Sequence, residues 1–333
     1  MNDASAQQIG AALQRLRSAG HRVRRRPARE TLHALASALD SWRDPDSPVR
    51  RALRTDFADA AGFSPAMVDA GMARALAGWT GDALGSLLDG ELGGIEALEG
   101  SAERNACGFE VTSVLLAGSL PSPTLLGLLA PLLLRSPVLA KTSAHDPVTA
   151  GLVASSVAAA DPELGACIEI VAFAGSDRDC VDALLGADCV GASGSDQTMA
   201  SVAARVQPPR RLVSYGHRLS VAAVAADRPA DSAARLAEDV ALWDQLGCLS
   251  PLAVFVEDRD GGETAAFAAA RAGALAELEE RWPRGRISPR ASAAIQRERD
   301  EAEMRAASGA PVHLHRGAGS SWTVVAEADS RFR

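Results

Sequence analysis

Residues 138–160, VLAKTSAHDPVTAGLVASSVAAA, indicate the fold class of this 333-residue chain. The apolar run at 138–141 is typical of a short buried strand, and the run at 148–160 predicts a helix. A strand followed by a helix is the unit from which mainly parallel sheets are built. The stretch therefore predicts one strand–helix unit of an α/β fold.

The same alternation extends over residues 108–225. Further strands are predicted at 109–117, 167–173, 188–192, 211–214 and 220–225, with helices at 124–134, 177–185 and 195–206. Strands that alternate with helices imply a mainly parallel sheet covered by helices on both faces. Residues 108–225 are therefore expected to form one α/β domain.

The segments on either side have a different texture. Residues 1–107 predict a helical N-terminal region, with helices at 31–42, 49–61, 64–77 and 81–88. Residues 226–333 predict a third domain, with a helix from 229 toward Cys248, strands at 252–257 and 322–326, and helices at 262–282 and 291–307. The basic run HRVRRR at 21–26 is interpreted as a solvated surface segment, and the alternative is contact with an anionic partner or phosphate.

Composition argues against several classes of protein. A net charge of −8 argues against general nucleic-acid binding, because that function needs a basic surface. The most apolar stretch, residues 111–140, is interrupted by Pro121, Pro123, Pro131 and Arg135, so it indicates buried core rather than a membrane span. Residues 1–20 lack the apolar segment of a signal peptide, and we expect a cytoplasmic protein.

The cysteines suggest one reactive thiol and no metal site. Cys107, Cys167, Cys180, Cys189 and Cys248 form no C-x-x-C pair and no ligand spacing with histidine, which favours free thiols over disulfides or zinc. Cys248 stands between a predicted helix and a predicted strand, where a thiol can face a cleft as a nucleophile. The alternative for this cysteine is a small buried hydrophobe.

Five short motifs follow one another in an order that is known from one superfamily. They are LAGSLP at 116–121, VLAKTS at 138–143, GASGS at 191–195, YGHR at 215–218 and QLGC at 245–248. Together they resemble the aldehyde dehydrogenase superfamily, and more closely its acyl-CoA reductase branch, which includes the bioluminescence fatty-acid reductase subunit. The resemblance covers most of residues 50–330. It implies a Rossmann-type parallel-sheet cofactor domain and an α/β catalytic domain beside the helical N-terminal region.

The resemblance also implies a nicotinamide cofactor. The implied cofactor-binding residues are Lys141, Ser143, His145, Gly194, Ser195 and Gly216. Lys141 matches a lysine that contacts the adenosine ribose in this superfamily. Gly194 and Ser195 stand between a strand and a helix, where backbone N–H groups suit a phosphate, although an ordinary turn has the same composition. Ala144 stands where members that prefer NAD often carry an acidic residue, so NADPH is expected, with NADH as the alternative.

In the same way, the resemblance assigns the catalytic roles. Cys248 is the implied nucleophile, and its backbone N–H is one oxyanion donor. Ser119 stands where the superfamily places an oxyanion-hole asparagine, and a hydroxyl is a shorter and less fixed donor. His217 follows Gly216, and from this position we expect it to donate a proton to the leaving thiolate or the hemiacetal oxygen, with a plain surface histidine as the alternative. Ser214 replaces the water-activating glutamate of hydrolytic members, which favours reduction over aldehyde oxidation.

These expectations combine into NADPH-dependent reduction of an acyl-thioester, a fatty acyl-CoA or an acyl-carrier, to an aldehyde through an acyl-cysteine. The expected partners are that thioester, an acyl-donor protein subunit, and further copies of the chain in a homo-oligomer. Two alternatives stay open: a catalytically weak binding or scaffold subunit, and a cysteine acyltransferase or thioesterase. Because family members continue well past the strand at 322–326, we expect a catalytic domain that is incomplete at its C-terminus.

Overall fold

The computed structural model of the chain describes residues 3–100, 105–225, 229–259 and 261–331. The chain divides into two compact units. The first unit comprises Met1–Ala61 and Met72–His217, and the second comprises Gly62–Gly71 and Arg218–Arg333. The first unit therefore holds most of the N-terminal helices together with the main sheet.

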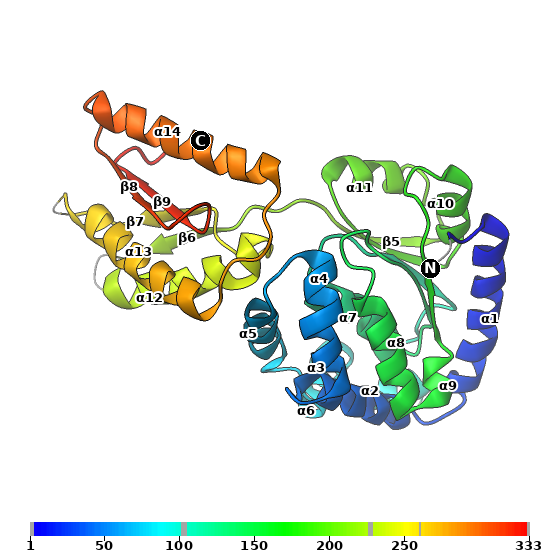
Figure 1. Cartoon of the computed structure of the whole chain (residues 1–333). Coiled ribbons are helices and arrows are strands. Elements are labelled where there is room, and N and C mark those ends of the chain that lie inside the picture. Colours follow the sequence, from blue (N-terminus) through cyan, green and yellow to red (C-terminus); the bar gives the residue numbers. More distant parts are fainter. Residues whose placement is uncertain (1–2, 101–104, 226–228, 260, 332–333) are drawn as a thin grey trace. The chain divides into compact units, whose positions relative to one another are not determined.

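A five-stranded sheet forms the centre of the first unit (Figure 1). Its strands are β1 Thr112–Leu115, β2 Val138–Lys141, β3 Ile168–Val171, β4 Cys189–Ser193 and β5 Arg211–Tyr215. They follow the order β3-β2-β1-β4-β5, and every neighbouring pair is parallel. Val138, Leu139 and Ala140 of β2 are fully buried, because helices cover both faces of the sheet. The predicted α/β fold with a parallel sheet is confirmed.

Helices surround this sheet on both faces. They are α1 Ala6–Arg24, α2 Ala28–Arg43, α3 Pro48–Ala52, α4 Ala58–Ala61, the end of α5 Pro65–Leu76, α6 Gly81–Leu92, α7 Pro121–Leu133, α8 Thr149–Ala160, α9 Pro162–Gly165, α10 Arg178–Leu184 and α11 Asp196–Ala203, with a π-helical segment at Leu53–Phe57 and a 3-10 segment at Ile95–Glu99. The connections through α7 and α8 run in one direction along the sheet, and those through α10 and α11 run in the other. Right-handed crossovers therefore place these two pairs on opposite faces (Figure 1).

α1 and β1 of the first unit differ from the sequence prediction. The 19-residue helix α1 is not among the predicted helices, although it begins with a capping box between Ser5 and Gln8. Ile9 and Leu16 of this helix are fully buried in one apolar cluster with residues of α10 and the sheet. β1 is shorter than the predicted strand at 109–117, because Phe109 lies in a loop with 41% of its surface exposed.

The second unit contains two small sheets and the helices that cover them. β6 Val221–Val224 pairs in parallel with β7 Ala253–Val256, and β8 Val312–Arg316 pairs antiparallel with β9 Thr323–Glu327. The helices are α12 Pro229–Ala241, α13 Glu263–Arg281 and α14 Pro289–Ala307, together with the beginning of α5. Phe267 and Leu275 of α13 lie in two apolar clusters that join this helix to β6 and to β9. β8 is a strand that the sequence pattern does not predict.

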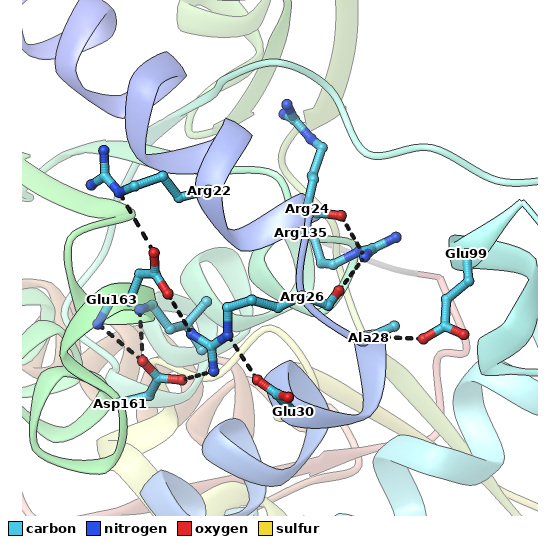
Figure 2. A network of polar contacts seen from close by, with 10 residues as sticks. Arg22, Arg24, Arg26, Ala28, Glu30, Glu99, Arg135, Asp161 and Glu163 are labelled. Atoms are coloured by element: carbon cyan, nitrogen blue, oxygen red, sulfur yellow. Dashed lines mark hydrogen bonds and ion pairs between the residues drawn. The ribbon is translucent and has the colours of Figure 1, made fainter.

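The basic run at 21–26 is partly buried by contacts within the first unit. Figure 2 shows that Arg26 points among three acidic side chains. Its Nη2 atom lies 2.5 Å from Asp161, its Nη1 atom 3.2 Å from Glu163 and its Nε atom 2.8 Å from Glu30. The side chain of Arg24, which is 16% exposed, pairs with Glu110 at 3.1 Å. The interpretation of the run as a solvated surface segment is therefore wrong for Arg24 and Arg26.

The basic run forms the junction between α1 and α2. Arg135, which follows the end of α7, also contacts this junction (Figure 2). Its guanidinium donates to the carbonyl oxygens of Arg24 and Arg26 at 3.2 and 3.1 Å, and also to that of Leu98. Burial lowers the pKa of the Arg135 side chain below its usual value. The junction is thus held by charged groups that come from distant parts of the chain.

Replacing Arg26 by Gln should destabilise the chain by roughly 1–3 kcal/mol, because the partly buried Asp161 loses a charged hydrogen-bond partner. The hydrogen bond from Arg26 is the main reason that the pKa of the Asp161 carboxyl lies below its usual range. A carboxyl with a lowered pKa contributes stability above its unfolded pKa of about 4, and this contribution is lost as the pH falls. Thermal melts should therefore show a deficit for Arg26→Gln at neutral pH that shrinks in acid.

Arg25→Gln is the matched control for this measurement. Arg25 is exposed, and its side chain forms no hydrogen bond or ion pair with any residue that the structure describes. Its replacement should leave the melting temperature unchanged. Equal melting temperatures for the Arg26 and Arg25 variants at neutral pH would contradict the structural role of Arg26.

Candidate active site

Most of the predicted site residues lie at one edge of the five-stranded sheet. Parallel strands bring their carboxyl ends to the same edge, and the strand order reverses between β1 and β4, where open α/β sheets bind ligands. The site residues at this edge are Ser119 after β1, Lys141, Ser143 and His145 at and after the end of β2, Gly194 and Ser195 after β4, and Gly216 and His217 after β5. Cys248 belongs to the second unit, where it lies between α12 and β7.

Lys141 is the last residue of β2 and is half-buried. Its Nζ atom donates to the Thr142 carbonyl at 3.2 Å and lies 5.4 Å from the centre of the Phe173 ring. Desolvation lowers the pKa of the Lys141 ammonium group. The Asp3 carboxylate acts on this charge from a distance, and no carboxylate among the described residues forms an ion pair with it. The ammonium group therefore keeps donors for a ligand, and its charge fits a ribose or phosphate oxygen.

Ser143 connects two loops of this edge. Its hydroxyl donates to the Gly118 carbonyl at 2.7 Å and accepts from the backbone N–H of His145 at 3.1 Å. Ser143 is buried, and its hydroxyl proton is already used within the protein. The bond to Gly118 holds the loop of Ser119 against the loop of His145, whose side chain is exposed.

The start of α11 brings together three further predicted residues. Ser195 is the cap of this helix, and its Oγ atom accepts from the Thr198 N–H at 3.2 Å. The Asp196 carboxylate accepts from the His217 N–H at 2.9 Å, and a Cβ atom at Gly216 would lie 2.8 Å from the same carboxylate. Glycine at 216 thus allows the loop after β5 to approach α11 closely. The negative charge of Asp196 makes this helix start less favourable to a phosphate than a bare N-terminus.

Ser119 lies in the loop that leads from β1 into α7. Pro121 is the first residue of α7 and Pro123 is in its first turn, so two of the N–H groups that a helix start normally offers are absent. This helix start is therefore a poor phosphate site. The Ser119 hydroxyl is partly buried and forms no hydrogen bond with any described residue. It remains free to donate to a ligand.

Cys248 follows a turn with an uncommon backbone. Trp243, Asp244 and Gln245 have φ angles of 57°, 52° and 65°, which lie in the left-handed region. This conformation costs roughly 1–2 kcal/mol for each residue other than glycine. None of the three is a glycine, so the surrounding packing has to hold the turn. Such strain is concentrated at functional sites.

Trp243 anchors this turn inside the second unit. Its side chain is buried, and its ring meets the Phe63 ring edge to face at a centroid distance of 5.3 Å. Its backbone N–H donates to the Met67 sulfur at 3.1 Å. A Cβ atom at Gly71 would lie 2.3 Å from the Trp243 ring, so the ring packs directly against the backbone of α5.

Asp244 and Gln245 close the rest of the turn. The Asp244 carboxylate accepts from the Gly285 N–H at 3.1 Å, and burial raises the pKa of this carboxyl. The Gln245 side chain donates to the Pro251 carbonyl at 3.3 Å. Sequence reasoning misses this turn, because left-handed residues are expected at Gly and Asn and only Asp244 is of a type enriched there. The three anchoring side chains are apparent only in the structure.

Cys248 itself is exposed. Its carbonyl oxygen accepts from the Ser220 hydroxyl at 2.6 Å, whereas its backbone N–H donates to no acceptor among the described residues. Leu246, Leu249 and Leu252 beside it are 62%, 83% and 54% exposed. The alternative of a small buried hydrophobe is therefore wrong. An exposed thiol with a free N–H and apolar neighbours is suited to carrying an acyl group.

Other parts of the molecule offer less. The described residues contain no group of three or more His, Cys, Asp or Glu side chains placed to hold a metal ion. An open groove of about 560 Å³ lies along α1 at the amino end of β3, where Arg15 and Glu169 are paired at 2.6 Å. None of the helices in the described ranges has both the length and the apolar character that a bilayer crossing requires.

Solved structures identify the class of fold as that of the aldehyde dehydrogenases. An NAD-dependent benzaldehyde dehydrogenase from Corynebacterium glutamicum matches with a TM-score of 0.71 and 16% identity, over 96% of this chain and 71% of that one. An oxidoreductase from Marinobacter aquaeolei matches with a TM-score of 0.73 and 14% identity, over 97% and 69%. The NADP complex of a glyceraldehyde-3-phosphate dehydrogenase from Methanocaldococcus jannaschii matches with a TM-score of 0.69 and 10% identity, over 98% and 72%.

The family follows from the sequence match. Residues 23–331 match the family described as Acyl-CoA reductase (LuxC). The chain therefore belongs to the acyl-CoA reductase (LuxC) family, and the resemblance inferred from the five motifs is confirmed. A comparison with curated protein sequences gives no match.

Limiting iodoacetamide should label Cys248 and Cys107 well ahead of the other three cysteines. Cys167, Cys180 and Cys189 are buried, and desolvation raises the pKa of each thiol, to about 11 for Cys167. A raised pKa reduces the thiolate fraction near neutral pH, and burial excludes the reagent. Peptide mass mapping of the native protein measures the order, and the same reaction in denaturant should label all five. Early labelling of Cys167 in the native protein would contradict this part of the structure.

Proposed function

We propose that the chain reduces an acyl-thioester to an aldehyde with NADPH, through an acyl group on Cys248. The observation that carries the proposal is the exposed Cys248 directly after the left-handed turn, in a chain of the acyl-CoA reductase family. A thiolate is a strong nucleophile, and the carbonyl carbon of a thioester is a matching electrophile.

The chemical step begins at the Sγ atom of Cys248. The thiolate attacks the thioester carbonyl, a new C–S bond forms, and the bond to the CoA or carrier sulfur breaks as that thiolate leaves. We assign the free N–H of Cys248 as a donor to the oxyanion, Ser119 as the second donor, and His217 as the source of a proton. NADPH supplies, when bound, the hydride that reduces the acyl group, and collapse of the thiohemiacetal then releases the aldehyde and the Cys248 thiolate.

The end of β2 supports the choice of NADPH. Lys141 has N–H groups that find no acceptor among the described residues, and both Ala144 and His145 are exposed beside it. A phosphate on the ribose would meet a cation there, and no carboxylate at position 144 would repel it. The structural relatives include one NAD-dependent enzyme and one solved with NADP, so this fold accommodates both cofactors. We assign the diphosphate of the cofactor to the Gly194–Ser195 turn, because this turn follows β4 where the strand order reverses, and the Asp196 carboxylate that disfavours an anion there already accepts a hydrogen bond from the His217 N–H.

Ser214 supports reduction over hydrolysis. It lies exposed in β5, two residues before Gly216. A neutral hydroxyl does not take a proton from water near neutral pH as a carboxylate can, so water attack on acyl-Cys248 is not assisted there. The acyl-enzyme should therefore persist until hydride transfer.

The three leucines around Cys248 favour an aliphatic acyl group. Leu246, Leu249 and Leu252 all expose more than half of their surface. Covering apolar surface gains roughly 25 cal/mol for each Å² removed from water, so an alkyl chain is a better partner for them than a polar one. A fatty acyl group is the substrate class that we propose.

A fatty acyl-CoA added without NADPH should leave one acyl group on the protein. The adduct should be seen by intact-mass measurement, should map to Cys248, and should be lost in Cys248→Ala but retained in Cys107→Ala, the other exposed cysteine. Adding NADPH should discharge the adduct as aldehyde. Rapid release of free fatty acid would instead indicate a thioesterase, and the absence of any adduct would indicate a binding subunit.

NADPH should bind at least as tightly as NADH, as measured by quenching of tryptophan fluorescence. Lys141→Met should weaken NADPH by about tenfold or more, because one charged contact is worth roughly 1.5–3 kcal/mol. Ala144→Glu should shift the preference toward NADH, because the new carboxylate repels a 2′-phosphate and can bind the ribose hydroxyls. A clear NADH preference of the unmodified chain would show that other residues discriminate between the two cofactors.

A further inference from the structure

We infer that Gly71, on α5, is a positioning residue for Cys248 and that it acts through Trp243. The inference rests on the proposed role of Cys248 and adds a residue that no motif of the sequence marks. Gly71 lies inside a helix, where glycine is less favourable than alanine because it loses more backbone freedom. A close contact that only a residue without a Cβ atom allows would account for glycine at this position.

The close contact is with the ring of Trp243. A Cβ atom on Gly71 would lie 2.3 Å from Cε2, 2.4 Å from Cζ2 and 2.9 Å from Cδ2 of this ring, and real Cβ atoms do not approach that closely. The ring contacts Phe63 edge to face, and the backbone N–H of the same residue is bonded to the Met67 sulfur. A side chain at position 71 would therefore have to displace Trp243 from α5.

Displacement of Trp243 would release the turn that leads to Cys248. Trp243 is the first of three consecutive left-handed residues, and this backbone conformation persists only where its surroundings determine it. A change of any of these φ angles to the right-handed or extended region redirects the chain that follows. The N–H of Cys248 and its thiol lie within five residues of Trp243, so both would move.

Hydrogen–deuterium exchange tests whether Gly71 holds the turn through Trp243, and it needs no assumption about activity. In Gly71→Ala, the peptide that covers residues 243–251 should exchange at least about tenfold faster than in the unmodified chain, because the turn is no longer held. Gly273→Ala is the matched control, since Gly273 also lies within a helix of the second unit and a Cβ atom there would meet nothing within 4 Å. The control should exchange like the unmodified chain in this peptide.

Acyl transfer tests whether the held turn positions Cys248 for reaction. Acylation of Cys248 by a fatty acyl-CoA should slow by about tenfold or more in Gly71→Ala, whereas the affinity for NADPH should stay within about twofold, because misplacing a nucleophile affects the chemical step. Trp243→Phe removes ring atoms that crowd position 71. The double variant should therefore acylate faster than Gly71→Ala alone, which is a coupling that two independent effects on stability would not produce.

The outcomes separate the inference from the proposed function. If Gly71→Ala does not fold, Trp243→Phe alone is measured, and faster exchange of residues 243–251 supports the inference. The inference is overturned if exchange of residues 243–251 is unchanged in either variant. It is also overturned if the unmodified chain is acylated and Gly71→Ala is acylated at the same rate. If the unmodified chain is not acylated at all, the proposed function fails, and the exchange measurement still decides whether Gly71 holds the turn.

Discussion

The parallel pairing of β1 with both β2 and β4 is the constraint on which the first unit depends. It places the reversal of strand order at β1 and β4, and it brings the loops that follow β1, β2, β4 and β5 to one edge. The bond between Ser143 and the Gly118 carbonyl then joins two of these loops directly. A shift of β1 by one residue would turn its buried side chains to the other face and separate the loops.

The second unit presents Cys248 by a different means. Its turn is locally unfavourable, and a buried tryptophan, a partly buried carboxylate and a close contact with a glycine hold it in place. The exposure of Cys248 follows from this support, and so does its backbone N–H, which has no acceptor among the described residues. A relaxed turn would remove the strain but would leave the direction of the thiol undetermined.

The parts of the fold that the sequence predicts well are those with a strong local pattern. β2 coincides with the prediction at 138–141, because its residues form a continuous apolar run that is buried on both faces. α1 and β8 are missed, since α1 has a polar composition and β8 alternates apolar residues with His313 and His315. For the candidate site, the order of the motifs predicted the sheet edge and Cys248. The left-handed turn could not be predicted, because its residue types do not indicate it.

By itself, the sequence determined the α/β class, the membership in a family and the approximate positions of most strands, because these depend on short apolar runs and on motif order. Only the tertiary structure decided which polar groups are free. Arg26 is paired with Asp161, the Ser143 hydroxyl is bonded within the protein, and Lys141 keeps unused donors. These outcomes depend on contacts between residues far apart in the chain, such as that of Gly71 with Trp243, and local periodicity carries no information about such contacts.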